Sequence, residues 1–102
     1  MPEAPLLFLM LIKISETVRN NPSLRGWIDE IEGEYMDRFG AFGPSVAHLV
    51  LHRAPWDFAL VFPGSEASVR FLTEAIESRA PGQTEILTLQ GRNLDDFRAA
   101  PA

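Results

Sequence analysis

An apolar segment near the N-terminus, Leu6 to Ile14, constrains the fold more than any other part of this chain. Successive side chains of a strand point to opposite faces, so a segment without polar alternation is apolar on both. Such a strand lies inside a sheet that is covered on each side. Its seven continuous apolar residues are too few for a membrane helix, which needs ~20. A signal peptide begins with basic residues, and this chain has Glu3 there, so we do not expect the segment to be a signal peptide. We therefore expect it to be a buried strand of a cytoplasmic protein.

A second constraint is the segment 48–62, HLVLHRAPWDFALVF, which is typical of two strands joined by a tight turn. Residues 46–52 and 57–62 are rich in strand-forming side chains. Pro55 separates them, and proline fits a turn because it has a fixed φ and no N–H for a ladder. The segment therefore predicts a β-hairpin.

We expect a four-residue loop, Arg53 to Trp56, because this is a common hairpin length. The loop would set three pairs opposite each other: His52 with Asp57, Val50 with Ala59, and His48 with Val61. These six side chains would share one small, partly polar face. The opposite face would carry the bulkier set: Ala47, Leu49, Leu51, Phe58, Leu60 and Phe62. We expect this bulkier face to pack under helices.

Two segments have helical periodicity. The first carries an apolar stripe after Asn21 and Pro22, which suit the start of a helix, and Ser15–Ser23 before it reads as a polar connection. The stripe consists of Leu24, Trp27, Ile28, Ile31, Tyr35 and Phe39. Gly26 and Gly33 interrupt this helix, and close backbone packing would explain them. The second helix should start after Ser65 and end near Arg79, with this stripe: Val69, Leu72, Ala75 and Ile76.

The last strand is expected over 84–90, with Leu87 in the core and Thr84, Ile86, Thr88 and Gln90 on the other side. A final helical turn is expected over 94–98. The order strand, helix, strand, strand, helix, strand predicts one α+β domain over residues 1–102. Its fold would be a ferredoxin-like βαββαβ sandwich, a four-stranded antiparallel sheet with two helices on one face.

The uncovered face of that sheet would expose His48, Val50, Ala59, Val61 and Ile86, an apolar patch larger than monomers usually carry. A second sheet would cover it, so we expect a homodimer that forms an α/β barrel with a cavity. The net charge of −5 and the lack of a basic run argue against nucleic acid and anionic lipid. The absence of cysteine excludes disulfides and thiolate metal sites.

Four stretches of the chain resemble a known family: LIKIS at 11–15, Ala54-Pro55-Trp56-Asp57-Phe58, FPGSEASVRFL at 62–72, and TEILTLQGRNLDDF at 84–97. They are similar to GYD-domain proteins, small members of the dimeric α/β-barrel superfamily. The family's Gly-x-Tyr-Asp motif falls on residues 54–57, where Asp57 is kept, Trp56 replaces the tyrosine and Ala54 replaces the glycine. The resemblance implies the same barrel fold and self-association.

His48 and His52 invite a metal hypothesis, but on a strand they stand ~13 Å apart. Zinc–nitrogen bonds are ~2 Å long, so one ion cannot join them within a subunit and we expect no metal. The pair of His52 and Asp57 is a better candidate, because a neighbouring carboxylate prepares an imidazole to act as a general base. A cross-strand polar pair that only holds the hairpin is the simpler interpretation.

Two classes of function follow. The first is a homo-oligomeric binding or interaction domain, whose cavity would hold a small apolar molecule or be filled by side chains. Trp56, His48, Val50 and Thr88 would contact such a ligand. The second, by analogy with related barrels, is a cofactor-independent monooxygenase or isomerase for a small aromatic or polyketide-like substrate. Its catalytic candidates are His52, Asp57 and His48.

Overall fold

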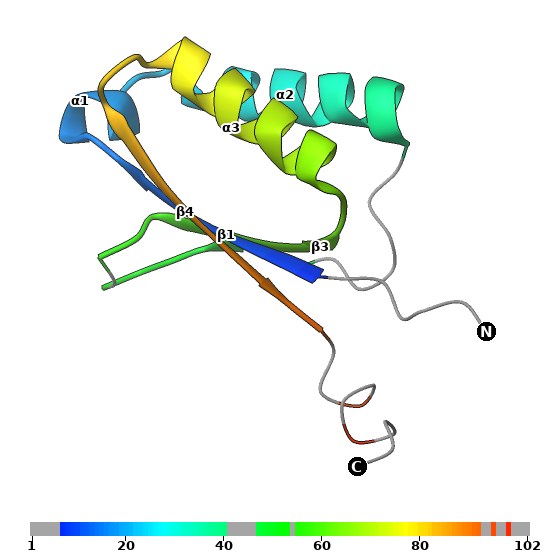
Figure 1. Cartoon of the computed structure of the whole chain (residues 1–102). Coiled ribbons are helices and arrows are strands. Elements are labelled where there is room, and N and C mark those ends of the chain that lie inside the picture. The colour runs from blue at the N-terminus through cyan, green and yellow to red at the C-terminus, as the bar shows by residue number, and fades with distance from the viewer. Residues whose placement is uncertain (1–6, 41–46, 54, 93–94, 96–97, 99–102) are drawn as a thin grey trace.

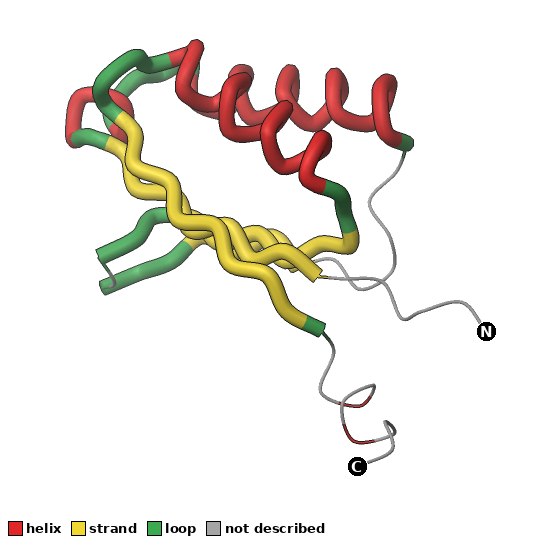
Figure 2. The backbone as a smooth tube through the Cα atoms, in the orientation of Figure 1, coloured by secondary structure: helices red, strands yellow, loops and turns green. Residues whose placement is uncertain are grey.

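The computed structural model describes residues 7–40, 47–53, 55–92, 95 and 98. Within them the elements are β1 (Leu7–Ile14), α1 (Glu16–Arg19), α2 (Leu24–Phe39), β2 (Ala47–Val50), β3 (Phe58–Pro63), α3 (Glu66–Arg79) and β4 (Thr84–Gly91). The strands form one antiparallel sheet, and α2 and α3 lie together on one side of it (Figures 1 and 2). The predicted ferredoxin-like α+β sandwich is confirmed, with α1 as a short additional helix. The turn expected over 94–98 lies largely outside the described residues.

The first strand is the structural centre of the sheet, whose order is β2-β3-β1-β4. β1 pairs antiparallel with β3 on one side and with β4 on the other. Leu7 lies opposite Pro63 and Gly91 at one end of these ladders. Both edges of β1 are therefore hydrogen-bonded, which confirms the central strand predicted from its apolar sequence.

Strand pairing divides the sheet into two faces, because directly opposite residues point the same way. The helix face, under α2 and α3, comprises Phe8, Met10, Ile12, Ile14, His48, Val50, Phe58, Leu60, Phe62, Thr84, Ile86, Thr88 and Gln90. The open face comprises Leu7, Leu9, Leu11, Lys13, Ala47, Leu49, Ala59, Val61, Pro63, Glu85, Leu87, Leu89 and Gly91. In Figures 1 and 2 both long helices lie on the same side, so no described helix covers the open face.

The hairpin register differs from the predicted one by a single residue. His48 lies opposite Leu60 rather than Val61, and the Leu51 N–H donates to the Asp57 carbonyl at 2.8 Å. The turn therefore contains five residues, 52–56, and Arg53 adopts a left-handed φ of 58° within it. As a consequence, each side chain of β2 points to the face of the sheet opposite to the one predicted. His48 and Val50 belong to the helix face, where the sequence had placed Leu49.

The orientation of β4 is also opposite to the prediction. Ile86 lies across from Ile12 and points to the helices, whereas Leu87 and Leu89 lie on the open face. Leu87 is thus not a core residue, and its exposed fraction is 41%. Both faces of β4 carry apolar side chains, so the alternation of its sequence does not indicate which face is buried. The pairing of β4 with β1 determines which face is buried. Leu51, also predicted in the core, follows the end of β2 and is only half-buried.

The core consists of two clusters under the helices. The first consists of Phe8, Met10, Ile31, Tyr35, Phe62 and Leu72. In it the Tyr35 ring meets the Phe62 ring edge-on at 6.1 Å. The second cluster is smaller and consists of Ile12, Ile14, Val18 and Ala80. Leu60, Ile76 and Ile86 pack against both clusters, which confirms that the predicted helix stripes meet β3.

The segment between β1 and α2 is more ordered than the predicted polar connection. Ser15 caps α1, and its hydroxyl accepts a hydrogen bond from the Val18 N–H at 3.2 Å. Helix α2 begins at Leu24 after Ser23, not after Asn21. The Asn21 side chain instead accepts from the Ser23 N–H at 2.9 Å and so shapes the preceding turn.

Helix α3 begins with the predicted cap at Ser65, whose hydroxyl accepts from the Ser68 N–H while the Ser68 hydroxyl accepts from the Ser65 N–H. Gly64 fits tightly against this cap. A Cβ there would lie 2.8 Å from both a Phe62 ring carbon and the Ser68 Oγ. In contrast, a Cβ at Gly26 or Gly33 meets no described atom within 4 Å, so the expected close packing of these glycines is not found.

We predict opposite effects of alanine at these glycines. Gly33→Ala should raise the free energy of unfolding by about 0.5–1 kcal/mol, because alanine loses less backbone entropy in a helix and has room here. Gly64→Ala should lower it by about 1–3 kcal/mol, because the new methyl group overpacks the cap. Urea denaturation measures both changes. A destabilising Gly33→Ala would show that the helix is packed closely at this point.

Candidate functional site

Asp57 connects the hairpin to the centre of the sheet. Its backbone N–H donates to the Ile12 carbonyl at 2.8 Å, and its carbonyl accepts from Leu51. Its carboxylate accepts from the Ile14 N–H at 2.9 Å through one oxygen, and from Arg19 at 2.8 Å through the other. Through its side chain Asp57 joins β1 to α1, and through its backbone it joins the two ends of the hairpin turn and β1. This arrangement is typical of a structural residue.

The predicted pair of His52 and Asp57 is not formed. His52 lies at the start of the turn and is exposed, and Trp56 lies at its end and is half-buried. Within the described residues, the hydrogen bonds of the Asp57 carboxylate go to Arg19 and Ile14. The one-residue change of register separates the two side chains, because Leu51 and not His52 lies opposite Asp57.

His48, Val50 and Thr88 were expected to line a cavity on the uncovered face, and the structure places all three on the helix face. His48 and Val50 lie on β2, opposite Leu60 and Phe58. Thr88 lies opposite Met10, away from the other two. The structure therefore brings His48 and Val50 together, but on the other side of the sheet.

The open face is made largely of leucine. Leu49, Leu87 and Leu89 are 52%, 41% and 47% exposed, which is unusual for large apolar side chains. The β1 residues between them are half-buried, and Ala59 is the smallest side chain on the neighbouring β3. Charge appears at one end of this face, where Lys13 lies opposite Glu85. The result is an apolar centre with a charged end, the composition of a protein interface.

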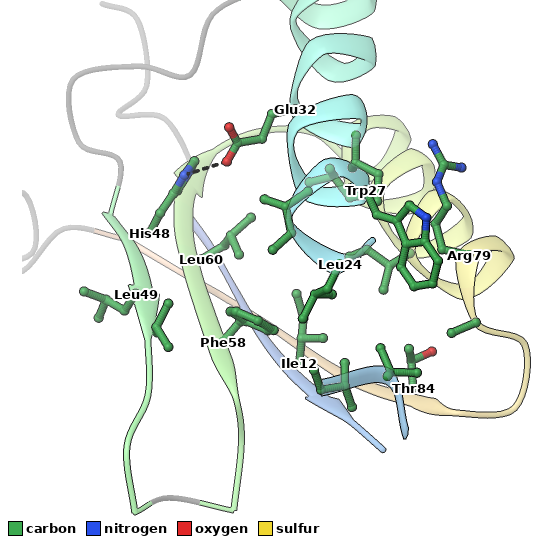
Figure 3. A pocket seen from close by; sticks show the side chains of 18 residues that line it. Ile12, Leu24, Trp27, Glu32, His48, Leu49, Phe58, Leu60, Arg79 and Thr84 are labelled. Atoms are coloured by element: carbon green, nitrogen blue, oxygen red, sulfur yellow. Dashed lines mark ion pairs between the residues drawn. The ribbon is translucent and has the colours of Figure 1, made fainter. Parts of the chain in front are cut away.

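A pocket of about 210 Å³ opens on the other side of the sheet, between the helix face and α2 (Figure 3). Fourteen of its eighteen lining residues are apolar. Those that define its walls are Ile12 and Phe58 from the sheet, Leu24, Trp27 and Ile28 from α2, and Ile76 from α3. All four residues of the second core cluster also line this pocket.

Two polar side chains meet at the rim of this pocket. His48 Nδ1 on β2 lies 3.3 Å from Glu32 Oε1 on α2, and Figure 3 shows the pair joined between the strand and the helix. A glutamate on a helix is usually solvated, so the residue type of Glu32 alone does not indicate this contact. The signal for its position is its spacing, because it follows Ile31 and lies one turn after Ile28, at the border of the apolar stripe.

The described residues contain no group of three or more histidine, cysteine, aspartate or glutamate side chains that could hold a metal ion. In the same part of the chain, no helix is both long and apolar enough to cross a membrane. Comparison with protein-family models, with curated proteins and with solved structures gives no match. What the open face and the pocket do is therefore inferred from their own chemistry.

We predict that Asp57 stabilises the fold mainly through the backbone of β1. Asp57→Ala should cost about 1–3 kcal/mol, because it leaves the half-buried Ile14 N–H without its acceptor. Arg19→Gln removes only the exposed ion pair and should cost about 0–1 kcal/mol. Urea denaturation of both variants separates the two contributions. Equal losses would mean that the ion pair, and not the backbone contact, is the important one.

Proposed function

We propose that the protein is a homodimeric interaction domain whose two sheets pack open face to open face, as in a dimeric α/β barrel. The observation that carries this proposal is the exposure of Leu49, Leu87 and Leu89 on one uncovered sheet face. Full burial of one leucine side chain is worth ~1.5–3 kcal/mol. A second copy offers the same apolar surface, so a two-fold contact would bury both at once.

The residues of the open face favour a packed interface over a cavity between the sheets. The sequence predicts small or polar residues there, which would leave space for a ligand. The observed face instead presents leucines from β1, β2 and β4, whose bulk can fill the space between two sheets. The resemblance to GYD-domain proteins implies the same mode of association. An interaction surface is therefore better supported than a ligand cavity between subunits.

The alternative of a cofactor-independent enzyme is not proposed. It requires an imidazole next to the Asp57 carboxylate, and that carboxylate bonds Arg19 and the backbone of Ile14. His52 lies exposed in the turn, and His48 lies on the opposite face from the open leucines. The described geometry does not bring the three catalytic candidates together.

We predict that Leu89→Glu converts the dimer into a folded monomer, because a charge within an apolar interface is costly to bury. Met36→Glu is the matched control, since Met36 is 48% exposed but lies on α2. Light scattering at micromolar concentration should give twice the 11.4 kDa chain mass for the wild type and for Met36→Glu. Circular dichroism checks that Leu89→Glu remains folded. A monomeric wild type would contradict the proposal.

A further inference from the structure

We propose that the pocket between the helix face and α2 binds a small molecule of one or two rings, with a single polar end that is neutral or cationic. The polar end would meet Glu32 and His48 at the rim, and the rings would lie against the apolar wall. The pocket lies on the helix side of the sheet and shares Leu49 with the open face, so the experiments below test ligand binding and dimerisation separately.

The size of the pocket limits the ligand. Its volume of about 210 Å³ exceeds that of engineered apolar cavities of ~150 Å³, which take up benzene. It is smaller than the ~300–1,000 Å³ of most drug-sized ligand sites. A single aromatic ring with a substituent, or two small fused rings, fits this range. Nucleotides and long acyl chains do not.

The pocket exists because apolar side chains from two layers face a space that neither layer fills. Phe58 and Leu60 point to the helices yet remain half-buried. Val50, which is on the helix face and also lines the pocket, is 64% exposed. Side chains beside an empty space lack dispersion contacts on that side. An apolar ring would supply those contacts and remove the same surface from water.

The charged residues near the pocket determine which kind of polar group the ligand can carry. Four lining residues are polar: Glu32, His48, Arg79 and Thr84. The Arg79 guanidinium is already bound to Glu30 at 3.3 Å and to Glu34 at 3.6 Å, so its charge is offset. Glu32 is partly exposed at the rim and offers carboxylate oxygens that accept hydrogen bonds. A hydroxyl or amine can donate to this carboxylate, whereas a ligand carboxylate would be repelled.

Phenol and benzoate test both parts of the inference, because they share a ring and differ in charge. In NMR titrations of the full chain, phenol should shift the methyl resonances of Ile12, Ile28 and Ile76. Benzoate should bind about tenfold more weakly, a difference of ~1.4 kcal/mol. Glu32→Gln should reduce that ratio severalfold, while Asp37→Asn, which removes a charge elsewhere on α2, should leave it unchanged.

A second pair of variants tests the location. Val50→Trp should close the mouth and abolish the phenol shifts. Met36→Trp, at an exposed site on α2 that does not line the pocket, should preserve them. Folded Leu89→Glu monomer should still bind phenol, which separates this inference from dimerisation. Three outcomes would overturn the inference: no phenol shifts in the wild type, shifts confined to the open-face leucines, or benzoate binding as tight as phenol binding.

Discussion

The apolar character of β1 on both faces is the constraint on which the rest of the structure depends. One side, with Phe8 and Met10, is almost fully buried under α2 and α3. The other side, with Leu9 and Leu11, has no described helix over it and lies between the exposed leucines of β2 and β4. A strand that is apolar on both sides gains stability when both are covered, and the described helices cover one. The proposed dimer follows from this asymmetry.

Features set by local periodicity could be predicted from the sequence. The order of elements, the central position of β1, the stripe containing Ile31 and Tyr35, and the Ser65 cap all depend on residues close together in the chain. The register of the hairpin depends on more distant contacts. Asp57 bonds the backbone of β1, and this attachment fixes where the turn ends. One additional turn residue was enough to reverse the faces of β2.

The pocket is a different kind of feature. It depends on the distance between the sheet and the helices, and not on the apolar periodicity of either layer. Periodicity shows that Trp27 and Phe58 are apolar and point inward, but it does not show whether they touch. The structure shows that both line a hollow. His48 was recognised as a residue of interest from its type and position. Its partner Glu32 required the fold, since the two lie on separate elements.

The strand order has a consequence for how the chain folds during synthesis. Leu7, at the start of β1, pairs with Gly91, at the end of β4, so one ladder of the central strand forms only when nearly all of the domain has been made. Ribosomes add ~5–20 residues per second, and the intervening chain therefore takes on the order of 4–20 seconds to appear. Until β4 appears, the edge of β1 that pairs with it is uncovered, and unpaired strand edges are prone to aggregation. Pairing of residues so far apart in the chain also slows the final closure of the sheet.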